Sequence, residues 1–144
     1  VYKKQIIYIS RTKKVINKPL IHQACLDKNL KKIKKLMKDK NFNINKRDKN
    51  NFTPLMNASH KGSMKIVELL LKNPKIKINA RSKNGKTALF FAAAAGHSKI
   101  VTKLINYGAN PKIKEKNNRK CTSRAPYNIA QICSRKKIMK MLKK

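Results

Sequence analysis

The 144-residue sequence contains few acidic side chains, few glycines and no tryptophan. Its four glycines are too few to build a glycine-rich loop that would cradle a phosphate. Its five acidic residues are scattered, so they offer no obvious carboxylate pair for general acid–base catalysis. Nothing in the sequence resembles a nucleophile elbow. We therefore expect a protein without enzymatic activity.

Cysteine is also scarce, and its spacing excludes a disulfide framework. Cys25, Cys121 and Cys133 are odd in number and form no paired motif, which favours a reducing, intracellular location, cytoplasmic or nuclear. A zinc site needs about four converging ligands, and the three histidines and three cysteines are distributed along the chain. We expect no metal and no cofactor, and we interpret His22 as a hydrogen-bonding residue at the start of a helix.

Long apolar runs are absent too. None approaches the roughly 18 residues that a membrane span requires, so we expect no transmembrane segment. Residues 1–17 have a basic start and a brief apolar patch but no small-residue cleavage site, which argues against a signal peptide. We interpret this segment as an N-terminal extension or the remnant of a preceding repeat. The first residue is Val1, and a spacer within a longer array is a further interpretation.

Positive charge is abundant. The 38 lysines and arginines give a formal net charge of +33. Because most of them lack a nearby acidic residue, they repel one another and favour a polyanionic neighbour. The abundance of Lys, Asn and Ile is also typical of AT-rich codon usage. Lysine runs without interleaved aromatics indicate diffuse attraction and not base readout.

The chain repeats itself with a period of 34 residues. Thr53-Pro54-Leu55-Met56-Asn57-Ala58 is matched by Thr87-Ala88-Leu89-Phe90-Phe91-Ala92, and each segment is followed by a glycine and an Ile-Val pair at the same offsets. The frame extends in both directions, with anchoring alanines at Ala24, Ala58, Ala92 and Ala130. The predicted repeats are therefore residues 18–50, 51–84, 85–118 and 119–144.

Each repeat is predicted to contain two helices. Thr53 can cap the first helix, Pro54 suits its first position, and Gly62 suits a turn with positive φ. The apolar residues of 64–71 then follow helical spacing. Residues 45–52, 79–86 and 110–120 are polar enough to project into water. Because two such helices cannot enclose a core alone, the repeats must stack. The predicted fold class is all-α, a solenoid of about four helix-turn-helix repeats joined by β-turn fingers.

The middle repeats resemble the ankyrin family. The Thr-Pro-Leu segment at 53–55, Gly62 with Ile66-Val67, and the Gly108-Ala109-Asn110 segment carry the likeness, which covers about residues 18–144. The family's histidine in the Thr-Pro-Leu-His segment is kept only as His22. Lys28 and Ser134 replace the hairpin glycine, as terminal capping repeats allow.

The resemblance implies a concave binding surface made by the fingers and the first helix of each repeat. The implied groove residues begin with Gln23, Leu26 and Asp27 and continue with Asn57, His60, Lys61, Phe91, Ala94, Ala95, Ile129, Ile132 and Cys133. The implied finger residues are Arg47, Lys49, Asn50, Phe52, Arg81, Lys83, Asn84, Lys86, Lys114 and Lys116, with Arg119 beyond them.

These residues imply a monomeric, non-catalytic scaffold whose groove and basic fingers hold an acidic protein partner. The alternative is non-specific binding of a polyanion, whether RNA, DNA or an anionic membrane, through the basic surface. Two interpretations of Phe90 and Phe91 remain open. Either one ring packs in the core and the other faces the groove as a hot spot, or both rings are buried against the next repeat.

Overall fold

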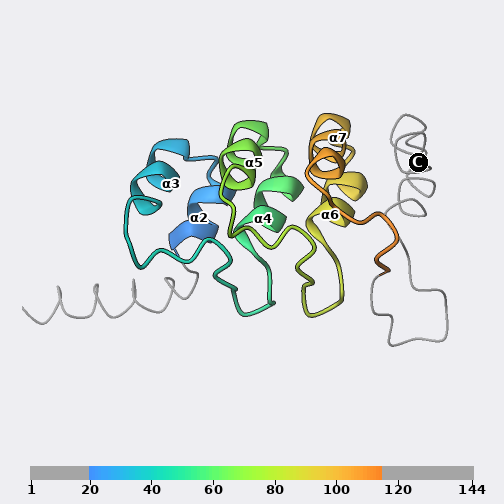
Figure 1. The fold of residues 1–144 in the computed structure, drawn as a ribbon, viewed down its shortest axis with the longest axis horizontal. Helices are drawn as coiled ribbons and strands as arrows, with labels where there is room; N and C mark the ends of the chain where they lie inside the picture. Colours follow the sequence, from blue (N-terminus) through green and yellow to red (C-terminus); the bar gives the residue numbers. More distant parts are fainter. Residues whose placement is uncertain (1–19, 115–144) are drawn as a thin grey trace, which may run out of the picture.

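The computed structural model describes residues 20–114, which form three helix pairs stacked in a row (Figure 1). The first helices of the pairs are α2 (Leu20–Leu26), α4 (Pro54–Lys61) and α6 (Ala88–Ala95), and the second helices are α3 (Leu30–Leu36), α5 (Met64–Leu71) and α7 (Ser98–Asn106). This part of the chain contains no strand. The predicted all-α repeat fold is confirmed. The segment 1–17 and the predicted repeat 119–144 lie outside the described residues.

The helix boundaries lie where the capping residues predict them. The Thr53 hydroxyl accepts a hydrogen bond from the Met56 N–H at 3.4 Å, and the Thr87 hydroxyl accepts one from the Phe90 N–H at 3.3 Å. Gly62 ends α4 with φ of 72°, and Gly96 ends α6 with φ of 80°. A left-handed residue here lets the turn N–H groups reach the last helical carbonyls, and glycine adopts that conformation without a Cβ clash.

The core forms between neighbouring repeats. Ala24, Ala58 and Ala92 have no exposed surface and lie on the inner helices, of which α2 contacts α4 and α4 contacts α6. These small side chains allow the three inner helices to pack more closely than the outer helices α3, α5 and α7 do. Between the two layers lie fully buried branched residues that recur every 34 positions, among them Ile66 and Ile100. Truncating one of these buried side chains to alanine costs about 2–5 kcal/mol.

The connections between repeats project to one side of the stack. The loops from α3 to α4 and from α5 to α6 extend beyond the inner helices, on the side away from the outer helices (Figure 1). They form the fingers on which the candidate site depends. None of the described helices has the length and apolar character that a bilayer span would require.

Candidate functional site

Each finger is a tight turn closed by its own side chains. In the first finger, the Asp48 carboxylate accepts hydrogen bonds at 2.9 Å from the N–H groups of Asn50 and Phe52. In the second, the Ser82 hydroxyl accepts one at 3.1 Å from the Lys86 N–H. The Asp48 and Ser82 N–H groups also donate to the carbonyls of Phe52 and Lys86. Short polar side chains that bond their own backbone favour turns of this kind.

Arg47 and Arg81 connect successive fingers. The Arg47 guanidinium donates to the Asn51 carbonyl of its own finger at 3.0 Å and to the Arg81 carbonyl of the next finger at 2.8 Å. The Arg81 guanidinium repeats this pattern one unit later, to the Gly85 carbonyl at 3.3 Å and the Lys114 carbonyl at 3.0 Å. Both arginines, predicted to contact a partner, therefore hold the finger array in register.

Asparagines form a second set of inter-repeat bonds that sequence reasoning missed. The Asn45 side chain donates to the Lys75 carbonyl at 2.7 Å and accepts from the Lys77 N–H at 2.8 Å. Asn79, 34 residues later, donates to the Gly108 carbonyl and accepts from the Asn110 N–H. The signal was present in the sequence, because an asparagine recurs at the same offset in two loops.

The other described finger residues lie at the surface. Lys49, Asn50, Lys83, Asn84 and Lys114 are exposed, whereas the Lys86 ammonium lies 4.9 Å from the centre of the Phe90 ring. A cation over a ring face is attracted by the negative face of the aromatic system. Lys116 and Arg119 lie outside the described residues.

An aromatic cluster connects the first finger to the inner helices. The Phe91 ring lies 4.9 Å from that of Phe52 and 5.9 Å from that of His60, in edge-to-face geometry. Phe90 is only 5% exposed, whereas Phe91 is half-buried. Of the two interpretations that the sequence left open, the structure supports one ring in the core and the other at the groove. We call Phe52, His60 and Phe91 the aromatic cluster.

The remaining predicted groove positions differ in accessibility. Lys61 is exposed, and Ala94 and Ala95 are half-buried. Gln23 and Asp27 are exposed and joined by a 2.8 Å hydrogen bond, and Leu26 is half-buried. Ile129, Ile132 and Cys133 lie outside the described residues.

Asn57, predicted to line the groove, is instead buried between repeats. It is 4% exposed, and its amide donates to His22 Nδ1 at 2.8 Å. The other ring nitrogen, Nε2, lies 2.7 Å from the Lys46 carbonyl, which can only accept. The proton is therefore on Nε2, and Nδ1 accepts from the amide. His22 joins an inner helix to the first finger loop and to α4, as the hydrogen-bonding interpretation of this residue predicts.

A family model for ankyrin repeats, in three copies, matches residues 21–117, more than half of the chain. The chain belongs to the ankyrin-repeat family. Ankyrin repeats mediate protein–protein interactions and are typically non-catalytic scaffolds. A search of the curated proteins finds no match.

The ankyrin array also has a basic depression that the sequence did not predict. It has a volume of about 620 Å³ and lies between the loop after α3 and the loop after α5. Four cationic side chains line it, from Lys46, Arg47, Lys75 and Lys77, together with Asn43, Asn45, Thr53 and Ala80. Because no acidic residue lines it, the depression attracts anions.

Two further observations concern reactive and metal-binding groups. No three or more His, Cys, Asp or Glu side chains come together to hold a metal ion within residues 20–114 of this ankyrin array. Cys25 is fully buried in the core, and burial raises the pKa of its thiol from 9.0 to about 12. Because the thiolate is the nucleophile, this cysteine is unreactive in the folded protein.

Proposed function

We propose that this ankyrin array is a non-catalytic scaffold that holds an acidic segment of a protein partner. The segment lies across the aromatic cluster, and the finger lysines attract it electrostatically. The proposal rests mainly on the position of the Phe91 ring, which is half-buried. It touches both a finger and an inner helix, so one partner side chain placed there contacts both walls of the groove.

Charge supports an acidic partner and not a neutral one. Lys49 and Lys83 at the finger tips form no ion pair with the described residues. The Asp48 carboxylate accepts two backbone N–H groups at Oδ1, and Glu68 pairs with Lys103 at 3.1 Å on the outer helices. Unpaired charges at a rim raise the association rate and select partners of opposite sign. We expect the protein to act as a monomer.

The test compares Phe91→Ala with Tyr107→Ala, which removes an exposed ring that follows α7. Proteins retained from a nuclease-treated lysate would be identified, and their affinities for the purified variants measured. We expect Phe91→Ala to weaken binding at least tenfold, as loss of an aromatic hot spot does at about 1.4 kcal/mol or more. If Phe91→Ala and Tyr107→Ala bound the partner with equal affinity, the groove would not be the binding surface.

The finger lysines are tested separately. Changing Lys49 and Lys83 to Gln should lower the association rate and flatten its dependence on salt, with a smaller effect on dissociation. Changing Lys31 and Lys35 of α3 to Gln removes the same charge from an outer helix and serves as the control. If both double variants associate equally, net charge alone attracts the partner and the fingers have no special part.

The basic depression favours polyanion binding as a second candidate function. Its four cations lie close enough together to neutralise several phosphates. For duplex DNA the logarithm of the binding constant then falls by about 0.9 per neutralised phosphate for each tenfold rise in salt. Under this alternative, changing Lys75 and Lys77 to Gln reduces that slope, and Phe91→Ala has no effect. The opposite pattern supports the protein scaffold.

A further inference from the structure

The turn between the two helices of a repeat differs from one repeat to the next. In the third repeat the turn residues are Gly96 and His97. The His97 ring packs over Gly62 of the preceding repeat so closely that a Cβ added there would lie 2.5 Å from His97 Cε1. His97 Nε2 also donates to the His60 carbonyl at 3.2 Å. Histidine and glycine thus close the space between the second and third turns.

One repeat earlier, the equivalent pair is different. Ser63 occupies the position of His97, and Lys28 occupies the position of Gly62, each 34 residues before. Lys28 retains the left-handed backbone, with φ of 54°, although it is not glycine. Here the turns border an open pocket of about 250 Å³, lined by Lys28, Leu30, Ser63, Met64, Lys65 and Ile66.

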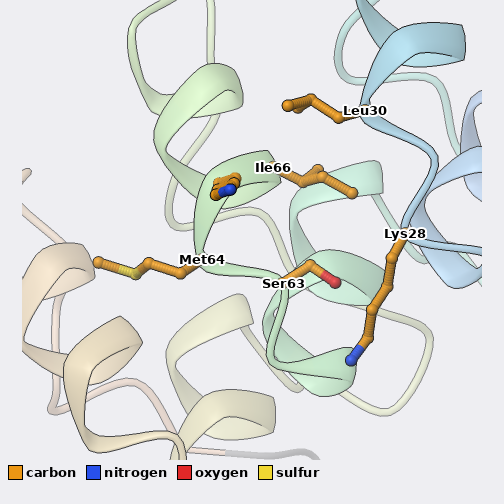
Figure 2. Close-up of a pocket in the computed structure, with 6 residues that line it drawn as sticks. Lys28, Leu30, Ser63, Met64 and Ile66 are labelled. Carbon is orange, nitrogen blue, oxygen red and sulfur yellow. The ribbon is translucent and has the colours of Figure 1, made fainter.

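The walls of this pocket are of two kinds. Figure 2 shows Leu30 and Ile66 extending toward each other, while the Ser63 hydroxyl lies on the side of the Lys28 chain. Ser63 is only 8% exposed, and its hydroxyl makes no hydrogen bond within the described residues. A buried hydroxyl without a partner costs about 1–3 kcal/mol, so a ligand that accepts its hydrogen bond would recover that loss.

The polar end of the pocket favours a negative group. Ser63 immediately precedes α5, whose first turn has neither a side-chain cap nor an acidic residue. The N–H groups of Met64, Ile66 and Val67 already donate to the carbonyls of Gly62 and Ser63, so only the dipole of α5 favours a negative charge at this end of the pocket. The Lys28 ammonium is exposed and forms no ion pair with the described residues. The Ser63 hydroxyl and the Lys28 side chain therefore form the polar part of the pocket, and Leu30 and Ile66 form its apolar part.

We propose that this pocket binds a glutamate side chain of the acidic partner. The Ser63 hydroxyl donates to the carboxylate and Lys28 neutralises it, while Leu30 and Ile66 contact the methylene groups. The inference rests on the proposed function in that the partner is acidic. It adds a second contact, however, because none of the lining residues belongs to the aromatic cluster. The array would thus contact its partner at the helix turns as well as at the groove.

The probes are a decapeptide of glutamate, the matching decapeptide of glutamine, and free glutarate. Amide chemical shifts of residues 63–66 would report binding at the pocket, and the His60 and Phe91 amides would report binding at the groove. We expect the glutamate peptide, and not the glutamine peptide, to shift the amides of residues 63–66. Glutarate should shift the same amides only at much higher concentration, since it lacks the other contacts of the peptide.

Two variants and one control identify the residues responsible. Lys28→Gln should weaken the response of residues 63–66 at least threefold, within the range of a single exposed ion pair. The double change Lys28→Gly with Ser63→His reproduces the pair that closes the next turn, so it should fold stably and abolish the response. Lys99→Gln removes one charge from the first turn of α7, beside the closed turn, and should leave the response unchanged.

Three results would overturn this inference. The first is a glutamate peptide that shifts the His60 and Phe91 amides but not those of residues 63–66; the groove proposal would then stand without the pocket. The second is a response that survives in the folded double variant. The third is binding of glutarate but not of the peptide, which would exclude a partner side chain as the ligand.

Discussion

Replacing Gly62 with alanine tests how tightly the repeats fit at their turns. The change should lower the free energy of unfolding for two separate reasons. The first is conformational, because alanine at φ of 72° is strained by about 1–2 kcal/mol. The second is steric, because the new methyl group would lie 2.5–2.9 Å from three atoms of the His97 ring. Displacing that ring removes its bond to the His60 carbonyl, which contributes about 1 kcal/mol.

Gly108 supplies the matched control. Its φ is 89°, so alanine there has the same kind of conformational strain, but an added Cβ would meet no atom within 4 Å. We expect Gly108→Ala to lower the free energy of unfolding by about 1–2 kcal/mol and Gly62→Ala by about 2–3 kcal/mol. Urea denaturation followed by far-ultraviolet circular dichroism measures both values.

A double-mutant cycle identifies the source of the difference. In a His97→Ala background the ring is absent, so Gly62→Ala should cost no more than Gly108→Ala does. The expected coupling between Gly62 and His97 is about 1 kcal/mol, well above the additivity error for independent sites. If Gly62→Ala and Gly108→Ala were equally destabilising in the original protein, the close packing of His97 over the preceding turn would be refuted.

Three further predictions concern buried and inter-repeat contacts. His22→Ala removes the bonds to the buried Asn57 amide and to the part-buried Lys46 carbonyl, and it should destabilise the fold by about 3 kcal/mol. An equal loss for the exposed His60→Ala in urea denaturation would contradict this. Arg81→Gln should cost about 1 kcal/mol because its carbonyl bonds join two fingers. Lys83→Gln at the finger tip should cost less than about 0.5 kcal/mol. Thermal denaturation compares the two variants, and a larger loss for Lys83→Gln than for Arg81→Gln would contradict the prediction. Burial raises the pKa of the Cys25 thiol from 9.0 to about 12, so above pH 9 the thiol ionises more readily in the unfolded chain than in the folded one. The free energy of unfolding should therefore be unaffected by this group below pH 9 and should fall as the pH rises toward 12. At pH 8 iodoacetamide should therefore label Cys25 only in denaturant, as peptide mass spectrometry would reveal; rapid labelling of the folded protein would count against its burial.

Features that act within one repeat could be predicted from the sequence. Thr53, Pro54 and Gly62 begin and end a helix through bonds to neighbours a few residues away, so their types alone indicate its boundaries. Ala58 and Ala92 indicated that repeats approach closely, because their spacing matches the period. The Phe90 and Phe91 pair could not be resolved in this way, since both rings belong to one helix and only its rotation decides which is exposed.

Features that act between repeats required the structure. The sequence indicates only that Arg47 is a basic finger residue, yet its guanidinium donates to the Arg81 carbonyl, 34 positions away. Asn57 occupies a groove position in the repeat frame but points to His22, 35 residues earlier. The basic depression and the pocket beside Ser63 are likewise formed by two loops, so neither loop alone indicates them.

The sequence by itself determined the repeat, the helix boundaries and the positive charge of the surface, because these depend on residue type and on bonds that span a few positions. The tertiary structure decided which of those residues remain accessible. Stacking brings positions about 34 residues apart into contact, where hydrogen bonds and close packing occupy some side chains and leave others at the surface. Ser63 and His97 illustrate the difference, because they occupy the same position in two successive repeats. Ser63 faces Lys28 and borders a pocket, whereas His97 packs over Gly62 and fills the equivalent space.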